Sequence, residues 1–130
     1  MRLLLDTHAL LWFLLNDSKL SLSANALIMD LRNEVLVSPA SYWEIAIKIS
    51  RGKYSLDVDE DFSTFLQREI QDNLLAILPI SVQHAGVVAT LPFHHQDPFD
   101  RLLIAQSMVE QIPVISTDVV FDAYGIDRRW

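Results

Sequence analysis

The sequence predicts an α/β layered fold with a mainly parallel sheet, in a single domain over residues 1–130. Short apolar runs without polar alternation recur along the chain, which is typical of strands buried on both faces. Segments with helical apolar spacing separate these runs. No stretch rich in Pro, Gly or Ser divides the chain, and an apolar fraction of 51% is enough for one core. We therefore expect about four to five short strands flanked by helices.

The amino-terminal segment predicts two strands and two helices in alternation. The apolar run Arg2–Leu5 is the first strand, and Thr7–Leu15, apolar nearly all round, is expected to be a buried helix. Apolar residues at helical spacing predict a second helix over Ser21–Asn33. The second strand is expected at Glu34–Val37, again a short run bounded by polar residues.

Two helices are expected in the middle of the chain. The first covers Ser41–Arg51, because Ser41 and Glu44 have the spacing of a capping box and Gly52 suits the position after a helix end. The second covers Asp59–Asp72, where aromatic and aliphatic residues gather on one side.

The carboxyl-terminal part contains the clearest helix signal. A strand over Leu74–Leu78 ends at a proline, and a helix over Val82–Leu91 stops before another proline. Pro98–Glu110 is the best-defined helix, because Asp97 is placed to cap it and proline suits the first helical position. The last predicted elements are a strand over Val114–Ser116 and a short helix over Val119–Ala123.

Four acidic residues lie where predicted strands pass into helices: Asp6, Glu44, Asp100 and Asp118. Taken singly, each could be a helix cap or a first-turn acid, and Glu44 could pair with Lys48 one turn later. Parallel strands, however, bring their carboxyl ends to one crevice. Carboxylates that converge there repel one another and need a cation. Oxygen ligands favour Mg²⁺ or Mn²⁺ over zinc, so the set predicts metal-assisted chemistry on phosphate.

Residues beside these acids are assigned supporting roles. Asp97 is expected to cap its helix and support the site rather than bind metal directly. Thr7 and either Ser116 or Thr117 are expected to donate hydrogen bonds at the rim. His94 and His95 could bind a metal as neutral imidazoles, but adjacent loop histidines more often do not.

Charge and composition narrow the function classes. A formal net charge of −7 argues against binding nucleic acid mainly by neutralising phosphates, so any such contact is expected to be local and metal-mediated. A separate basic protein could also supply the missing charge. The absence of cysteine excludes disulfides and thiolate metal sites, and fits a cytoplasmic protein. The apolar amino-terminal run is interrupted by Asp6 and His8, which argues against a signal peptide or membrane span.

Four segments of the chain together resemble the ordered motifs of a known family. They are residues 3–12 (LLLDTHALLW), 41–48 (SYWEIAIK), 94–106 (HHQDPFDRLLIAQ) and 116–121 (STDVVF). These segments resemble PIN-domain proteins and, more narrowly, VapC-type toxins of bacterial toxin–antitoxin pairs. The resemblance spans nearly the whole chain, and its most specific parts are the runs DPFDRLL and WEI.

The resemblance implies a three-layer PIN-like fold and a Mg²⁺- or Mn²⁺-dependent ribonuclease. By motif position, the core acids are Asp6, Glu44 and Asp100, and Asp118 is a fourth, less constant member. Asp6 and Asp100 would bind the metal directly, Glu44 would bind it or hold one of its waters, and Asp118 would complete the site or position a second ion.

The same resemblance implies partners. They are an RNA substrate, a second copy of the chain in a homodimer, and a cognate antitoxin whose tail enters the active-site groove. Lys48, Arg51 and Arg101 are candidate contacts for RNA phosphates, with surface charge or acid pairing as the alternative.

Two other function classes remain open from the sequence. A Mg²⁺-dependent phosphatase or phosphotransferase could use Asp6 as nucleophile, although such enzymes usually carry a second Asp two residues on, where this chain has His8. A non-catalytic interaction module would use the acids only as helix caps and surface charge.

Overall fold

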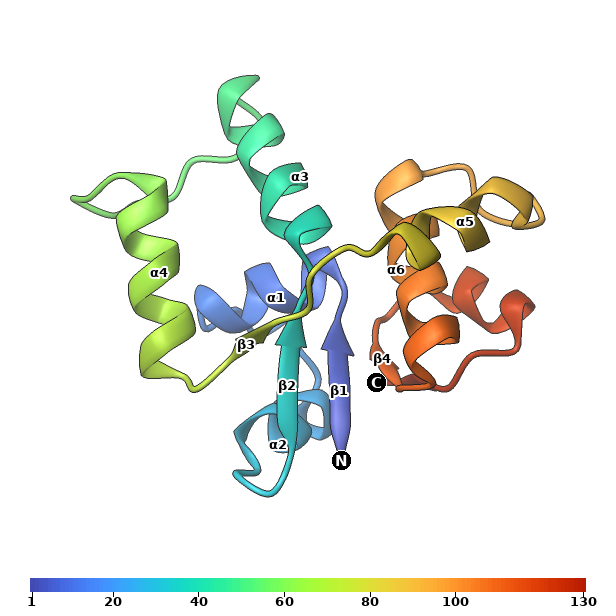
Figure 1. The fold of residues 1–130 in the computed structure, drawn as a ribbon. Helices are drawn as coiled ribbons and strands as arrows, with labels where there is room; N and C mark the ends of the chain where they lie inside the picture. Colours follow the sequence, from blue (N-terminus) through green and yellow to red (C-terminus); the bar gives the residue numbers. More distant parts are fainter.

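A parallel sheet of five strands forms the centre of the computed structural model, which describes residues 1–130 (Figure 1). The strand order is β3-β2-β1-β4-β5, and every neighbouring pair is parallel. The strands are β1 (Arg2–Leu5), β2 (Glu34–Val37), β3 (Ala76–Ile77), β4 (Val114–Ile115) and β5 (Arg128–Arg129). The α/β class and the parallel sheet expected from the sequence are confirmed. The strand β5 was not expected, because its arginines lack the apolar character of a buried strand.

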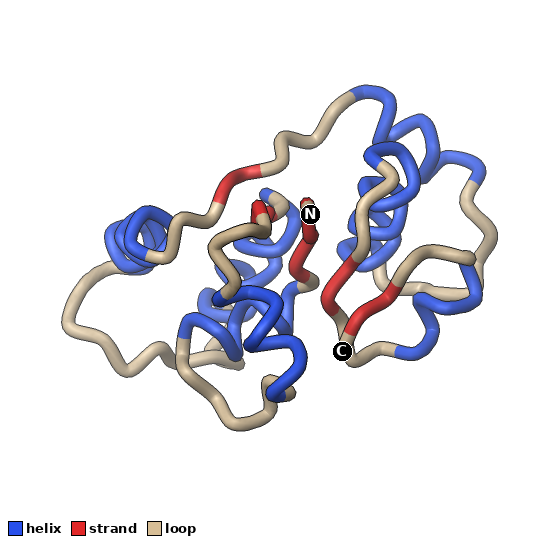
Figure 2. The backbone as a smooth tube through the Cα atoms, turned by 90° about the horizontal axis from the view of Figure 1, so that it is seen from below, coloured by secondary structure: helices blue, strands red, loops and turns tan.

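Helices cover both faces of this sheet, so the fold has three layers (Figure 2). They are α1 (Thr7–Leu14), α2 (Leu22–Met29), α3 (Pro39–Ser50), α4 (Phe62–Asp72), α5 (Val82–Thr90), α6 (Pro98–Glu110) and the 3₁₀ helix η1 (Val119–Tyr124). None of these helices is both long enough and apolar enough to cross a bilayer.

The central strand β1 contributes to two separate hydrophobic cores. Leu3 and Leu5 pack with side chains of α1, α2 and α3 on one face. Leu4 points to the other face and packs with residues of α6 and η1, among them Ile104 and Phe121. This alternation follows from the two-residue period of a strand, which sends successive side chains to opposite faces. An uninterrupted run of leucines is therefore what this strand position requires.

Two helices differ from the sequence expectation. The helix α3 begins at Pro39 and is capped by Ser38, whose hydroxyl accepts from the amide of Ala40 at 3.2 Å. The expected capping box at Ser41 is therefore wrong, and Ser41 is buried within the first turns.

The helix α2 is shorter than the expected span and buries a different face. Leu22 and Leu31 are 90% and 83% exposed, whereas Ala24 and Ile28 are buried. The apolar pattern identified a helix but assigned the wrong side of it to the core.

The sheet topology places a crevice beside β1. The chain leaves β1 toward β2 through helices on one face and returns to β4 through α5 and α6 on the other. Open parallel sheets bind ligands at such a switch of direction, outside the carboxyl ends of the strands. Leu5 pairs with Val37 and with Ile115, so the residues that follow these strands emerge together at this edge.

Candidate active site

Asp6 is the first acid at this edge, and its carboxylate has two roles. It caps α1 by accepting a hydrogen bond from the amide of Ala9 at 2.7 Å. The residue is only 4% exposed, and burial raises the pKa of the Asp6 carboxyl above its usual value. Hydrogen bonds from Ser116 and Ala9 lower this pKa in part, and the charge of Asp118 raises it further. A cap alone does not explain a carboxylate held in so unfavourable an environment.

Glu44 enters the same edge from α3. It is buried, and its Oε2 lies 3.1 Å from the Nζ of Lys48, one turn further along the helix. The ammonium of Lys48 also lies 5.4 Å from the centre of the Tyr54 ring. Lys48 is therefore the charge partner of Glu44, which was the alternative to its proposed role as an RNA contact.

Asp97 and Asp100 lie in one turn but have different surroundings. Asp97 caps α6, and its Oδ1 accepts from the amides of Phe99 at 2.8 Å and Asp100 at 3.2 Å, as expected. The Asp100 carboxylate accepts no such backbone hydrogen bond. Burial and the charge of Asp97 raise the pKa of Asp100 to about 7, with further contributions from Asp6 and Glu44 and an opposing one from His95. The negative charges of Asp97, Asp6 and Glu44 therefore all disfavour the ionised form of Asp100.

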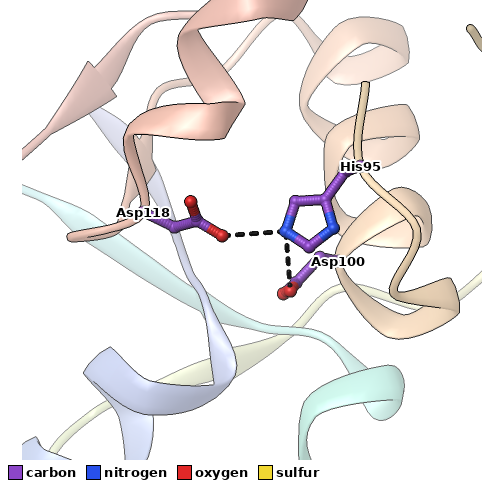
Figure 3. Close-up of side chains that lie close together, drawn as sticks. All are labelled: His95, Asp100 and Asp118. Carbon is purple, nitrogen blue, oxygen red and sulfur yellow. Dashed lines mark hydrogen bonds and ion pairs between the residues drawn. The ribbon is translucent and has the colours of Figure 1, made fainter. Parts of the chain in front are cut away.

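His95 joins Asp100 to Asp118, as Figure 3 shows. Its Nε2 lies 2.8 Å from Oδ2 of Asp118 and 3.2 Å from Oδ2 of Asp100. Its Nδ1 accepts from the amide of Asp97 at 3.2 Å, which leaves the proton of the neutral ring on Nε2, facing the two carboxylates. Asp118 also caps η1 by accepting from the amide of Val120 at 3.0 Å.

Arg101 holds the loop that carries His95 in place through hydrogen bonds to its backbone. The guanidinium donates to the carbonyls of Pro92, His95 and Leu91, and lies 3.8 Å from the ring centre of Phe93. Arg101 is only 5% exposed, so its donors are already committed to the loop. The interpretation of Arg101 as an RNA contact is therefore wrong, and the residue is structural.

Tyr124 ties the same loop to the carboxyl-terminal segment. Its hydroxyl donates to the carbonyl of Pro92 at 2.7 Å and accepts from the amide of His95 at 2.8 Å. The ring of His95 also packs edge-to-face on Phe121 of η1, with ring centres 5.8 Å apart. His95 is thus held at its backbone and at its ring.

The structure brings together only part of the predicted set at ligand distance. One ligand atom each from His95, Asp100 and Asp118 lies within 4.8 Å of the others, and neither Asp6 nor Glu44 joins that group. Both influence Asp100 electrostatically from the other side of the crevice. Thr7 is buried and its hydroxyl has no hydrogen-bond partner, whereas Thr117 is exposed. Ser116, rather than Thr117, contacts the acids, since its hydroxyl accepts from the amide of Asp118 at 3.0 Å.

The donor set fits a hard divalent cation. Carboxylate oxygens predominate, and two of the carboxyls have raised pKa values. The neighbouring basic groups are His8 and His95, Lys48, which is paired with Glu44, and Arg128, which is paired with Asp122. Such oxygen-rich sites suit Mg²⁺ or Mn²⁺, and one imidazole is compatible with Mn²⁺. A groove of about 870 Å³ between α1, α2 and α4 includes none of the four acids in its lining.

Comparisons with solved structures identify the architecture. VapBC2 from Rickettsia felis, solved bound to a DNA fragment from its promoter, aligns with a TM-score of 0.73 and 14% identity over 100% of this chain and 99% of the other. VapBC-1 from nontypeable Haemophilus influenzae aligns with a TM-score of 0.65 and 13% identity, over 99% and 97% of the two chains. FitAcB from Neisseria gonorrhoeae aligns with a TM-score of 0.60 and 16% identity, over 97% and 95%. At these identities the likeness concerns the fold.

The sequence comparisons identify a protein family but no individual curated relative. No curated protein matches the chain by sequence. The model of the PIN domain, in contrast, matches residues 3–126, a span that contains Asp6, Glu44, His95, Asp100 and Asp118. Because this match extends over nearly the whole sequence, the chain belongs to the PIN-domain family.

Proposed function

We propose that this protein is a metal-dependent endoribonuclease and the toxin component of a toxin–antitoxin pair. PIN domains are generally nucleases that use divalent metal ions. The observation that carries the proposal is the pKa of Asp100, which burial raises to about 7 together with the charges of Asp97, Asp6 and Glu44. Several carboxylates directed at one point without matching cations favour an ion and a phosphate substrate over a purely structural role.

The residues of the proposed site would have different roles: metal binding, orientation of a water, and positioning of the ligands. Asp6, Asp100 and Asp118 would hold Mg²⁺ or Mn²⁺ through carboxylate oxygens, and Glu44 would bind it or orient a water. When bound, the ion would supply positive charge to activate water and to stabilise the leaving oxygen of the phosphodiester. His95 would keep Asp118 and Asp100 in place through its Nε2–H, and Asp97 would fix the start of α6.

Substrate phosphates have few free cations near these acids. Lys48 would contact phosphate only if Glu44 turned from it toward the ion. Arg51 is exposed, but lies about 10 Å along α3 from Glu44 at 1.5 Å per residue. We therefore propose that the ion itself contributes much of the phosphate binding. RNA as substrate implies action in the cytoplasm.

The partner proposals rest on the solved structures of similar fold. VapBC2, VapBC-1 and FitAcB are complexes named for two components. We propose that this chain likewise binds a cognate antitoxin and forms a homodimer. Size-exclusion chromatography with light scattering tests the homodimer, and co-purification with the product of a neighbouring small reading frame tests the antitoxin.

A nuclease assay on total RNA tests the catalytic proposal. Wild type should cut RNA with Mg²⁺ or Mn²⁺ and stop when a chelator is added. Asp100→Asn should lose at least about 100-fold of the activity, as expected when a group that stabilises the transition state is removed. The matched control Asp72→Asn alters an exposed acid at the end of α4, and should cut normally. Equal cleavage by Asp100→Asn and wild type would show a contaminating nuclease or a different site.

A further inference from the structure

An exposed tryptophan stands beside the acidic crevice. Trp43 is 61% exposed and directly precedes Glu44 on α3, whereas a large aromatic side chain is usually well covered. Neither of the hydrophobic cores includes it. Its position is therefore unexplained by the packing of the fold.

Trp43 meets Phe99 across the gap between two helices that carry core acids. The two rings are edge-to-face, with centres 5.4 Å apart and planes at 76°. Phe99 directly precedes Asp100 on α6, so each ring is adjacent in sequence to one acid of the site. The charge of Glu44 contributes to the raised pKa of Asp100, so these two acids lie near each other. The aromatic pair thus borders the place where a substrate phosphate would bind.

The Phe99 contact fixes the indole without covering it. An edge-to-face pair restricts the orientation of both rings and leaves most of their remaining surface open. A flat, exposed and oriented ring is the feature that single-stranded nucleic acid binders use to stack bases, because every base has a π face. An alternative role in packing the two helices would bury the indole, and Trp43 is not buried.

The charge distribution makes such a contact necessary. Lys48 is engaged by Glu44, Arg101 is buried, and the chain has a net charge of −7. A binder with so few free cations gains little from phosphate neutralisation. Base stacking does not depend on protein charge and contributes roughly 1–3 kcal/mol per base. It is therefore a suitable source of affinity beside an acidic site.

We infer that Trp43, steadied by Phe99, is a stacking platform for an unpaired nucleobase next to the phosphate that is cut. This inference rests on the proposed nuclease function and adds a substrate class: RNA whose base at the cleavage site is free to leave its stack. Fully paired RNA cannot offer that base without the cost of unstacking it.

Binding is best measured in an Asp100→Asn background, which prevents cleavage and removes one charge that repels phosphate. The probe is a fluorescent oligouridylate, free or annealed to its complement, with a chelator in place of metal ion, because this variant is expected to lose the ion. Trp43→Leu should weaken binding of the free strand by roughly 5- to 150-fold, the equivalent of one stacked base. Trp43→Phe keeps an aromatic face and should retain most of the affinity. The slope of log Kd against log salt should stay the same, because no phosphate contact is lost.

Leu22→Ala is the control, since Leu22 is a still more exposed apolar residue on α2, at the opposite end of the sheet from the start of α3 (Figure 1). It should leave the Kd unchanged. Circular dichroism melting of each variant checks that the fold is intact. Sedimentation of each variant checks for a change in oligomeric state.

Three results would overturn the inference. Trp43→Leu could bind like its parent, Phe and Leu could weaken binding equally, or the annealed duplex could bind as well as the free strand. A loss of affinity that accompanies dissociation of a dimer would instead assign Trp43 to an interface between copies. If wild type cuts RNA with Mn²⁺ in these cases, only the stacking inference fails. If wild type neither cuts RNA nor binds the probe, the proposed function fails as well.

Discussion

The two walls of the candidate site are built differently. The first wall consists of Asp6 and Glu44, which are buried and have separate local partners, the amide of Ala9 and the ammonium of Lys48. The second wall consists of His95, Asp100 and Asp118, which are half-buried and share one imidazole between two carboxylates. The first wall is rigid because it belongs to β1 and α3. The second depends on a loop, so its geometry is expected to be easier to disturb.

The largest expected effect concerns the support of the second wall. Arg101→Ala removes the donors that serve the carbonyls of Pro92, His95 and Leu91; Pro92 still accepts from the Tyr124 hydroxyl, whereas His95 and Leu91 lose the guanidinium. Buried carbonyls that lose a charged donor destabilise a protein severely, so we expect a loss of about 3–5 kcal/mol of unfolding free energy. Urea unfolding measures it. The exposed Arg51→Ala should change stability by less than about 0.5 kcal/mol. Equal effects of the two would mean that Arg101 does not support the loop.

The second prediction concerns how the stability of the metal-free protein depends on pH, which reports on the acids of each wall. The raised pKa of Asp100, about 7 in the folded protein, means that the folded state holds this proton more tightly than the unfolded chain. Stability should therefore be highest near pH 4 for this group and should fall as pH rises toward 7, then level off. The buried Asp6 shifts in the same direction and adds to the fall.

The size of this fall follows from the Asp100 shift. A rise from 3.8 to about 7, in which the opposing effect of His95 is already included, corresponds to about 4 kcal/mol. Urea unfolding of the metal-free protein from pH 4 to 8 measures it. Asp100→Asn should flatten the profile and be more stable than wild type at pH 8. An identical slope in that variant would assign the titration to other groups.

The third prediction tests whether carboxylates of both walls bind the same metal ion. An ion bound between them would stabilise the folded state by about 2.7 kcal/mol at 100 times its Kd. Millimolar Mn²⁺ should therefore raise the melting temperature of wild type by several degrees. Both Asp6→Asn and Asp100→Asn should lose this shift, because each removes a carboxylate from a different wall. If only Asp100→Asn loses it, the ion belongs to the second wall alone.

The fourth prediction concerns the shared imidazole. His95→Ala should weaken Mn²⁺ binding by roughly 10-fold, as expected when a residue that orients metal ligands is removed. Isothermal titration calorimetry measures this change. His94→Ala is the matched control, because the adjacent His94 packs on Tyr124 and has no contact with the acids. If both variants bind Mn²⁺ like wild type, His95 does not position Asp118.

The smallest effect is expected in the first wall. Lys48→Ala breaks an ion pair whose lysine is partly exposed, and should cost no more than about 1 kcal/mol of stability. Loss of the lysine also frees Glu44 for a cation. The Mn²⁺ affinity measured by calorimetry should therefore stay the same or rise, whereas a fall would indicate that Lys48 itself supports the metal site.

Elements with two independent signals could be predicted from the sequence. The strand β1 has an apolar run with a polar end, and α6 has an Asp-Pro cap as well as helical spacing. The start of α3 was misplaced because Ser41 offered a capping pattern that competed with Ser38 and its following proline. Proline at the first helical position was the better signal. The strand β5 is defined by backbone pairing with β4, which side-chain character does not reveal.

The membership of the site stays a prediction, and its arrangement differs from the one expected. Only Asp6 and Asp118 follow strands, β1 and β4, whereas Glu44 lies within α3 and Asp100 follows the helix α5. The part played by His95 was missed, since adjacent loop histidines carry no periodic signal and its neighbour Asp118 lies 23 residues away. Arg101 was assigned to the surface because its carbonyl partners are distant in space and unmarked in sequence. Both errors concern contacts that form only when the loop folds back on α6.

The three leucines of β1 also fix the position of Asp6, the acid that follows this strand. A shift of this strand by one residue would send Leu4 into the core of Leu3 and Leu5, and would turn Asp6 to the opposite face. Because all three residues are leucines, the damage would fall on the core of Leu3 and Leu5, where a charged residue, Arg2 or Asp6, would replace one of them. A misaligned strand would therefore be rejected during folding before it could yield a folded but inactive protein. The alignment of the first acid is enforced by hydrophobic packing, so insertions or deletions in this strand should abolish folding and activity together.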